Sequence, residues 1–232
     1  MQYTRLAASF AFAAIVSFAT SAHSAVALSD LISNNDTFIS GGLVFSDFTF
    51  TTVGNVTPET EVNVDSVTDQ DGNFGIRFQG GFSDLQGGGS SGFTISYNVA
   101  FVDPLMNITG AMLQGNPTAI ISGLGSFTET FTGLGIDPLV IFDNADTGET
   151  DFIDSTSIIP PSNQLQVELD FFGEAGTPGG VTGSFVDQTF AGGVVPEVSS
   201  AATWGVLMLA VGCACVLNRR FQLVPLHKLA EK

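Results

Sequence analysis

The feature that most constrains the fold is an alternation of apolar and polar residues along short stretches of the chain. In the clearest stretch, residues 93–101, Phe93, Ile95, Tyr97, Val99 and Phe101 occupy every second position. Successive side chains of a β-strand point to opposite faces, so this period places one set in a core and the other in water. Similar alternation covers residues 47–51, 61–65, 74–79 and 165–171. Each stretch predicts a half-buried antiparallel strand.

Shorter strand candidates lie between these stretches, at residues 118–121, 126–131, 139–142, 152–159 and 183–190. Turn clusters rich in Gly, Pro, Asn and Asp separate them, including residues 71–73, 103–104, 137–138, 160–161 and 177–180. One short helix is expected at residues 28–34, capped by Ser29 or Asp30. About eight to ten strands with almost no helix predict an all-β fold, a single antiparallel β-sandwich of jelly-roll type.

The first 27 residues have the features of a secretory signal peptide with a signal helix. Arg5 provides a positive charge, and an apolar segment of 14 residues follows at positions 6–19. Ala25 and Ala27 fit the small-x-small cleavage rule, which predicts cleavage after Ala27; cleavage after Ser24 is the alternative. We therefore expect the Sec machinery to export the residues that follow.

A second membrane-directed segment lies near the other end of the sequence. Residues 201–217 form a run of 17 residues without a charge, followed by Arg219 and Arg220. A helix of this length spans roughly 26 Å, just enough to cross a bilayer core. Because arginines beside an apolar run favour the cytoplasmic side, we expect a transmembrane helix at 201–218 in the inner membrane and a basic cytoplasmic tail at 219–232.

Pro196 and Glu197 precede this run, and the order of Pro-Glu, apolar helix and arginine pair resembles the PEP-CTERM sorting signal of bacterial exosortase substrates. The resemblance implies that an exosortase recognises the Pro196-Glu197 region, removes the tail and transfers the rest to the cell surface or an exopolysaccharide matrix. Residues 28–190 would then be the exported domain and residues 191–200 the linker. A single-span membrane protein that keeps its tail is the alternative.

The predicted exported domain is strongly acidic. Between Leu28 and Pro196 the one basic residue, Arg77, stands against 21 Asp and Glu, a formal charge of 1 − 21 = −20. Such a surface repels phosphates, so we expect no nucleic-acid partner. The same segment contains no His, Cys or Lys, which excludes Ser-His-Asp, Cys-His and Schiff-base catalysis. Carboxylate-only glycoside hydrolysis stays formally open, but we expect no enzymatic activity.

Two acidic loops are candidate calcium sites. Asp69, Asp71 and Asn73 show the alternating oxygen spacing of a calcium loop, and Asp143 and Asp146 begin a second cluster that ends with Glu149 and Asp151. Such residues also stabilise turns without any metal, and this alternative stays open. The sequence thus favours an exported cell-envelope or matrix protein with a structural or adhesive domain. The second hypothesis is a surface module that binds carbohydrate or calcium.

Overall fold

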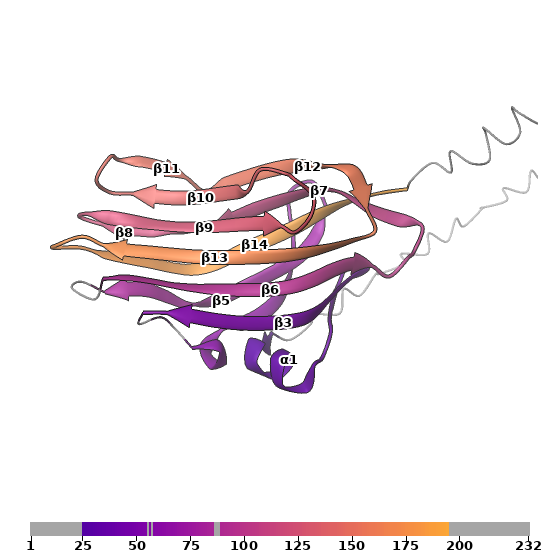
Figure 1. The fold of residues 1–232 in the computed structure, drawn as a ribbon, viewed down its shortest axis with the longest axis horizontal. Helices are drawn as coiled ribbons and strands as arrows, with labels where there is room; N and C mark the ends of the chain where they lie inside the picture. The colour runs from indigo at the N-terminus through magenta and orange to yellow at the C-terminus, as the bar shows by residue number, and fades with distance from the viewer. Residues whose placement is uncertain (1–24, 55, 57, 86–88, 195–232) are drawn as a thin grey trace, which may run out of the picture.

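Two antiparallel sheets packed face to face form the body of the molecule (Figure 1). The computed structural model describes residues 25–194 except residues 55, 57 and 86–88. The predicted apolar segment at 6–19, the Pro196-Glu197 motif, the apolar run and the basic tail lie outside the described residues. Among the described helices, none is long and apolar enough to cross a bilayer.

Each sheet contains seven strands. Sheet A has the spatial order β1 (Val26–Ala27), β4 (Asn63–Thr68), β5 (Phe74–Leu85), β14 (Gly180–Val194), β7 (Met106–Gly115) and β12 (Ile153–Ser162), with β8 (Thr118–Ile120) also on β14. Sheet B, nearer the viewer in Figure 1, has the order β11 (Glu149–Asp151), β10 (Leu139–Asn144), β9 (Gly123–Phe131), β13 (Gln164–Ala175), β6 (Ser90–Phe101), β3 (Leu43–Val53) and β2 (Phe38–Ser40). Two short helices complete the fold, α1 (Leu28–Asn34) and the 3-10 helix η1 (Glu59–Glu61).

The strand pairing follows one long folded ribbon. Strands β5, β6, β7 and β9 run along one half of the ribbon, and each pairs antiparallel with β14, β13, β12 and β10 respectively. Within each half, these four strands alternate between the two sheets. Strands β9 and β10, which join the halves, both lie in sheet B. This winding is the jelly-roll arrangement. The predicted antiparallel sandwich is confirmed.

Aromatic side chains fill the space between the sheets. One cluster surrounds Tyr97 of β6, whose ring centroid lies 5.8 Å from Phe45 and 5.9 Å from Phe78. A second cluster joins Phe82 of sheet A to Phe93 and Phe127 of sheet B at 4.9 and 5.8 Å. Rings at these separations gain contact energy beyond the area they bury, so they hold the two sheets together.

The alternation located most strands but missed four, of which β1 and β2 are only two and three residues long. It found no strand at residues 106–115, where β7 lies, because Thr109 is an extra residue between Ile108 and Gly110 and breaks the period of two. Strand β11 was missed because Glu149–Asp151 is fully exposed and shows no apolar alternation. Asp47 forms a similar interruption in β3, with a φ of 57° at a register shift. The predicted turn at 160–161 lies inside β12, at a shift in its register.

The ends of the domain also differ from the expectation. Helix α1 begins after Ala27 with no side-chain cap, so neither Ser29 nor Asp30 caps it. Val26 and Ala27 pair with Val64 and Asn63 of β4, so cleavage after Ala27 would remove strand β1, whereas cleavage after Ser24 would keep it. At the other end, residues 191–194 belong to β14 rather than to a linker.

Candidate functional site

A row of polar side chains crosses the outer face of sheet A. Arg77 belongs to this row, opposite Asp65 on one side and Asp187 on the other. Asp187 in turn lies opposite Gln114 of β7, and Gln114 opposite Ile153 at the sheet edge. Antiparallel pairing brings these residues together because side chains at paired positions lie on the same face of a sheet.

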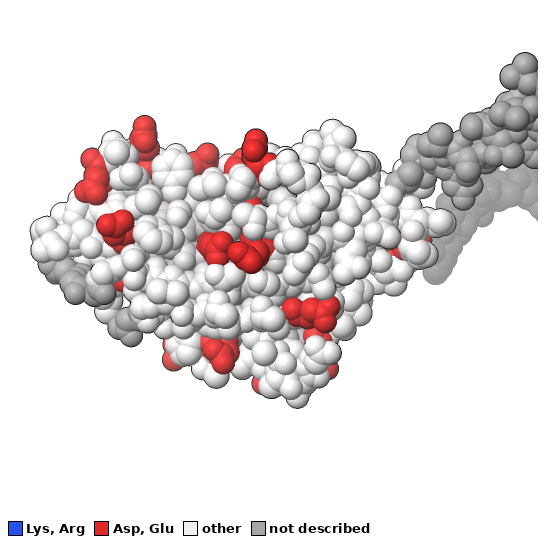
Figure 2. Space-filling view, in the orientation of Figure 1, with Lys and Arg blue, Asp and Glu red and all other residues white. Residues whose placement is uncertain are grey.

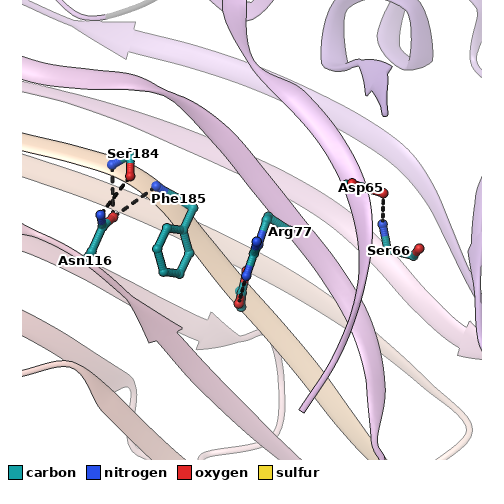
Figure 3. Close-up of polar contacts among 7 residues, drawn as sticks. Asp65, Ser66, Arg77, Asn116, Ser184 and Phe185 are labelled. Atoms are coloured by element: carbon teal, nitrogen blue, oxygen red, sulfur yellow. Dashed lines mark hydrogen bonds and ion pairs between the residues drawn. The ribbon is translucent and has the colours of Figure 1, made fainter. Parts of the chain in front are cut away.

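Arg77 and Asp187 form a bidentate ion pair. Nε and Nη2 of Arg77 donate to the two carboxylate oxygens of Asp187 at 2.6 and 2.7 Å. The hydrogen bond with Asp187, opposed in part by burial, raises the pKa of Arg77. The guanidinium carbon also lies 4.6 Å from the centre of the Phe185 ring (Figure 3). Two planar contacts therefore fix the guanidinium, and among the described residues Nη1 has no hydrogen-bond partner.

Asn116 positions the Phe185 ring through the backbone of β14. The register shifts between Gly183 and Phe185, which leaves Ser184 as an extra residue. Oδ1 of Asn116 accepts from the backbone N–H groups of Ser184 and Phe185 at 3.0 and 3.1 Å, and its Nδ2 donates to the Ser184 hydroxyl at 2.7 Å (Figure 3). One amide side chain thus accepts hydrogen bonds from the two backbone N–H groups at the bulge and holds Phe185 beside Arg77.

The turn at residues 69–73 borders the same face. Oδ1 of Asp69 accepts from the backbone N–H groups of Asp71 and Asn73 at 2.9 and 2.8 Å. Its Oδ2 accepts from Nδ2 of Asn73 and the hydroxyl of Thr189, both at 2.9 Å. Burial alone would raise the pKa of Asp69, but these hydrogen bonds outweigh it and lower that pKa. Asp69 is therefore a carboxylate whose two oxygens are already in use.

Two adjoining cavities make this face a groove, which we call the sheet A groove. They have volumes of about 260 and 360 Å³ and share Asp69 and Met112 in their linings. Hydrogen-bonding side chains of β5, β7, β12, β14 and the 69–73 turn are part of its lining, among them Arg77, Gln114, Ser155, Ser157, Thr189 and Asp187. The groove can therefore exchange hydrogen bonds with a polar ligand along much of its length.

The two predicted calcium loops do not meet. Asp69, Asp71 and Asn73 lie beside sheet A, whereas Asp143 and Asp146 belong to the β10–β11 hairpin of sheet B. Oδ2 of Asp143 accepts from the backbone N–H of Ala119 at 2.8 Å. No group of three or more His, Cys, Asp or Glu residues within the described ranges is placed to hold a metal ion. The Asp69 contacts with Asp71 and Asn73 lie within its own turn, whereas Asp143 links β10 to β8.

Sequence reasoning missed the residues at the centre of the groove. In the sequence, Arg77 stands out only as the single basic residue between Leu28 and Pro196, and neither Asp187 nor Gln114 belongs to a motif. The available signal was one positive charge within a predicted strand, since a buried partner is the usual companion of such a charge. Of the other predicted site residues, Ala25 and Ala27 lie at the start of the described chain, and Pro196, Glu197, Arg219 and Arg220 lie outside the described residues.

Comparisons with known proteins give no family. No family model and no curated protein matches the chain. The similar solved structures include a carbohydrate-binding module of family 61 with β-1,4-galactotriose, at 10% identity and a TM-score of 0.25, covering 61% of this chain and 88% of that module. A family 6 module of a Zobellia galactanivorans laminarinase matches at 15% identity and a TM-score of 0.26, covering 60% of this chain and 99% of that module. The tailspike protein 4 of bacteriophage CBA120 matches at 14% identity and a TM-score of 0.29, covering 62% of this chain and 19% of the tailspike chain. Similarities this low support no argument about what this chain binds.

Proposed function

We propose that this chain is an exported surface module that binds a neutral polysaccharide in the sheet A groove and does not cleave it. The observation that carries the proposal is the groove itself, in which hydroxyl, amide, carboxylate and guanidinium groups lie along two adjoining cavities. A sugar hydroxyl both donates and accepts hydrogen bonds, so a polysaccharide can use such a mixed lining at each unit.

The charge of the domain favours a neutral ligand. The formal charge between Leu28 and Pro196 is 1 − 21 = −20, and the single base, Arg77, is paired with Asp187. Anionic polysaccharides would be repelled by such a surface. Nη1 of Arg77 and the exposed amide of Gln114 can still donate to uncharged hydroxyl oxygens, because a pre-positioned planar donor loses little freedom on binding.

The state of the groove carboxylates favours binding over turnover. Glycoside hydrolysis needs a carboxylic acid whose raised pKa lets it protonate the leaving oxygen. In the groove, hydrogen bonds lower the pKa of Asp69, and Asp187 accepts two charge-assisted hydrogen bonds. Both carboxylates are therefore engaged with protein donors, an arrangement that does not favour proton transfer to a ligand.

Sorting through the C-terminal sequence is the second part of the proposal. Pro196 follows the last residue of β14, Val194, by only two positions, so removal of the tail beyond Glu197 would spare the whole of sheet A. We expect mass spectrometry to find a chain without Arg219 and Arg220 in a host that has an exosortase and an intact tail in a host that lacks it. An intact tail in both hosts would contradict the sorting proposal.

Binding can be tested on the full chain, purified in a detergent without a sugar headgroup. We expect a neutral glucan to retard the protein in affinity electrophoresis, and Gln114→Ala to reduce the retardation. Gln79→Ala is the matched control, because Gln79 is also an exposed glutamine on the outer face of sheet A but does not line the groove. Equal loss in both variants, or no retardation of the wild type, would contradict the proposal.

A further inference from the structure

A second hollow lies on the opposite face of the sandwich, on the outer surface of sheet B near the ends of β3, β6 and β13. Its volume is about 320 Å³. We call it the sheet B hollow, and the outward-facing side chains that define it are Thr51, Val53, Thr94, Asp170 and Phe172, with Gly92 between them. It shares no residue with the sheet A groove.

An apolar slot forms one half of the hollow. Val53 and Phe172 both lie opposite Gly92, one on each side, and they are 72% and 39% exposed. A Cβ atom at Gly92 would come within 2.6 Å of the Phe171 carbonyl oxygen, so no side chain can fill the space between them. Two strand spacings separate Val53 from Phe172, about 9 to 10 Å. One ring with contacts of about 3.5 to 4 Å on each side fits that width.

A polar row borders the slot two residues further along the strands. The hydroxyl of Thr94 donates to Oδ1 of Asp170 at 2.5 Å, which fixes the carboxylate beside the slot. Oδ2 of Asp170 makes no hydrogen bond with the described residues, and the hydroxyl of Thr51 lies opposite Thr94. A ring held in the slot would therefore meet an acceptor and a hydroxyl at its edge. An apolar ring face with a hydroxyl-bearing edge is the surface of a pyranose.

The geometry points to the sheet B hollow as a second carbohydrate site, which takes one pyranose ring of a neutral polysaccharide. The ligand class rests on the proposed function, whereas the location does not. Figure 2 shows this face with scattered carboxylates and no Lys or Arg, which disfavours acidic sugars. With one site on each face, a single domain joins two polysaccharide chains, which is the property of a matrix cross-linker.

Stoichiometry tests this inference. The full chain, in a detergent without a sugar headgroup, is titrated by calorimetry with a neutral hexasaccharide of glucose. We expect two equivalents to bind to the wild type and one to Phe172→Ala. The milder Phe172→Leu keeps the apolar bulk and is expected to weaken the second site roughly two- to twelvefold, the range of one aromatic contact. Phe152→Ala and Glu168→Gln, an exposed aromatic and a neighbouring carboxylate outside the hollow, are expected to keep both sites.

The outcomes separate the two proposals. If the wild type binds one equivalent, and Gln114→Ala weakens that binding while Phe172→Ala leaves it unchanged, the second site is overturned and the sheet A groove is supported. If the wild type binds one equivalent, and Phe172→Ala abolishes that binding while Gln114→Ala leaves it unchanged, the sheet A groove is overturned as a site and the hollow is supported. No binding by the wild type overturns both. A hollow that accepts a cationic amino-sugar hexamer but not the neutral one overturns the ligand class proposed for it.

Discussion

The hydroxyl of Tyr97 in sheet B donates a 2.6 Å hydrogen bond to Oε1 of Gln188 in sheet A, across the centre of the sandwich. Both side chains are buried, and Nε2 of Gln188 has no partner among the described residues. Glu129 is also fully buried in this core, with neither carboxylate oxygen bonded to a described residue. The core of an otherwise Phe-rich domain thus contains an acid that is costly to ionise.

The first prediction concerns the pH dependence of stability. Burial raises the pKa of Glu129 well above its ordinary value of 4.5. The folded state therefore holds the proton more tightly than the unfolded state, and this contribution is fully present below pH 4.5 and is lost as the pH rises towards the folded-state pKa. Glu129→Gln mimics the neutral acid. We expect it to match the wild type in urea unfolding at pH 4 and to exceed it at pH 8. Equal stability of the two proteins at both pH values would contradict the buried acid.

The second prediction concerns the Arg77–Asp187 pair. Asp187→Asn removes the charge that neutralises Arg77, whose side chain is 37% exposed. A fully buried pair would lose about 3 to 5 kcal/mol on breaking, but solvent screens Arg77, so we expect the free energy of unfolding to fall by about 1 to 2 kcal/mol. Glu168→Gln makes the same chemical change at an exposed residue that has no ion pair in the described chain. We expect this variant to leave the free energy of unfolding unchanged. Equal effects of the two variants would mean that the ion pair does not contribute.

The third prediction concerns Ile121, which is strained and exposed. Its φ is 70°, in the left-handed region that costs an L side chain about 1 to 2 kcal/mol, and its exposure of 71% leaves little packing to lose. The turn holds this conformation because the Ser122 hydroxyl donates to the Pro178 carbonyl at 3.1 Å. Ile121→Asn is expected to raise the melting temperature, since Asn tolerates this region. Ile120→Asn, in strand β8 with no positive φ, is expected to lower it; a fall in both variants would contradict the strain.

The fourth prediction concerns calcium. Hydrogen bonds already occupy both carboxylate oxygens of Asp69, so the turn needs no cation. We expect millimolar calcium to leave the melting temperature unchanged and to give no heat in a titration. Asp69→Ala is expected to lower the melting temperature equally with and without calcium. A calcium-dependent rise in melting temperature that Asp69→Ala abolishes would contradict this prediction and support a metal site at the turn.

Much of the fold could be predicted from the sequence because strand burial is written locally. Ile95 and Val99 alternate with polar neighbours, and they are buried as the alternation requires. The missed strand β7 shows the limit of this reasoning, since the extra residue Thr109 breaks the period and only its partners β12 and β14 show that the strand continues.

The candidate sites depended on long-range pairing. Asp69, Asp71 and Asn73 were found because a turn is local, and in the structure Asp69 accepts hydrogen bonds within that turn. Arg77 and Asp187 are 110 positions apart, and no local pattern connects them. The same holds for Val53 and Phe172, which form a slot only because both lie opposite Gly92.

The sequence by itself determined that the described domain is an acidic antiparallel β-sandwich, because period two and turn residues act over a few positions. It also carries the predicted export and sorting segments. The tertiary structure alone decided which strands are neighbours, and therefore which polar side chains share a face and where a glycine leaves a hollow. Pairing joins residues by their register across a sheet, and register is a property of the folded ribbon rather than of any segment within it.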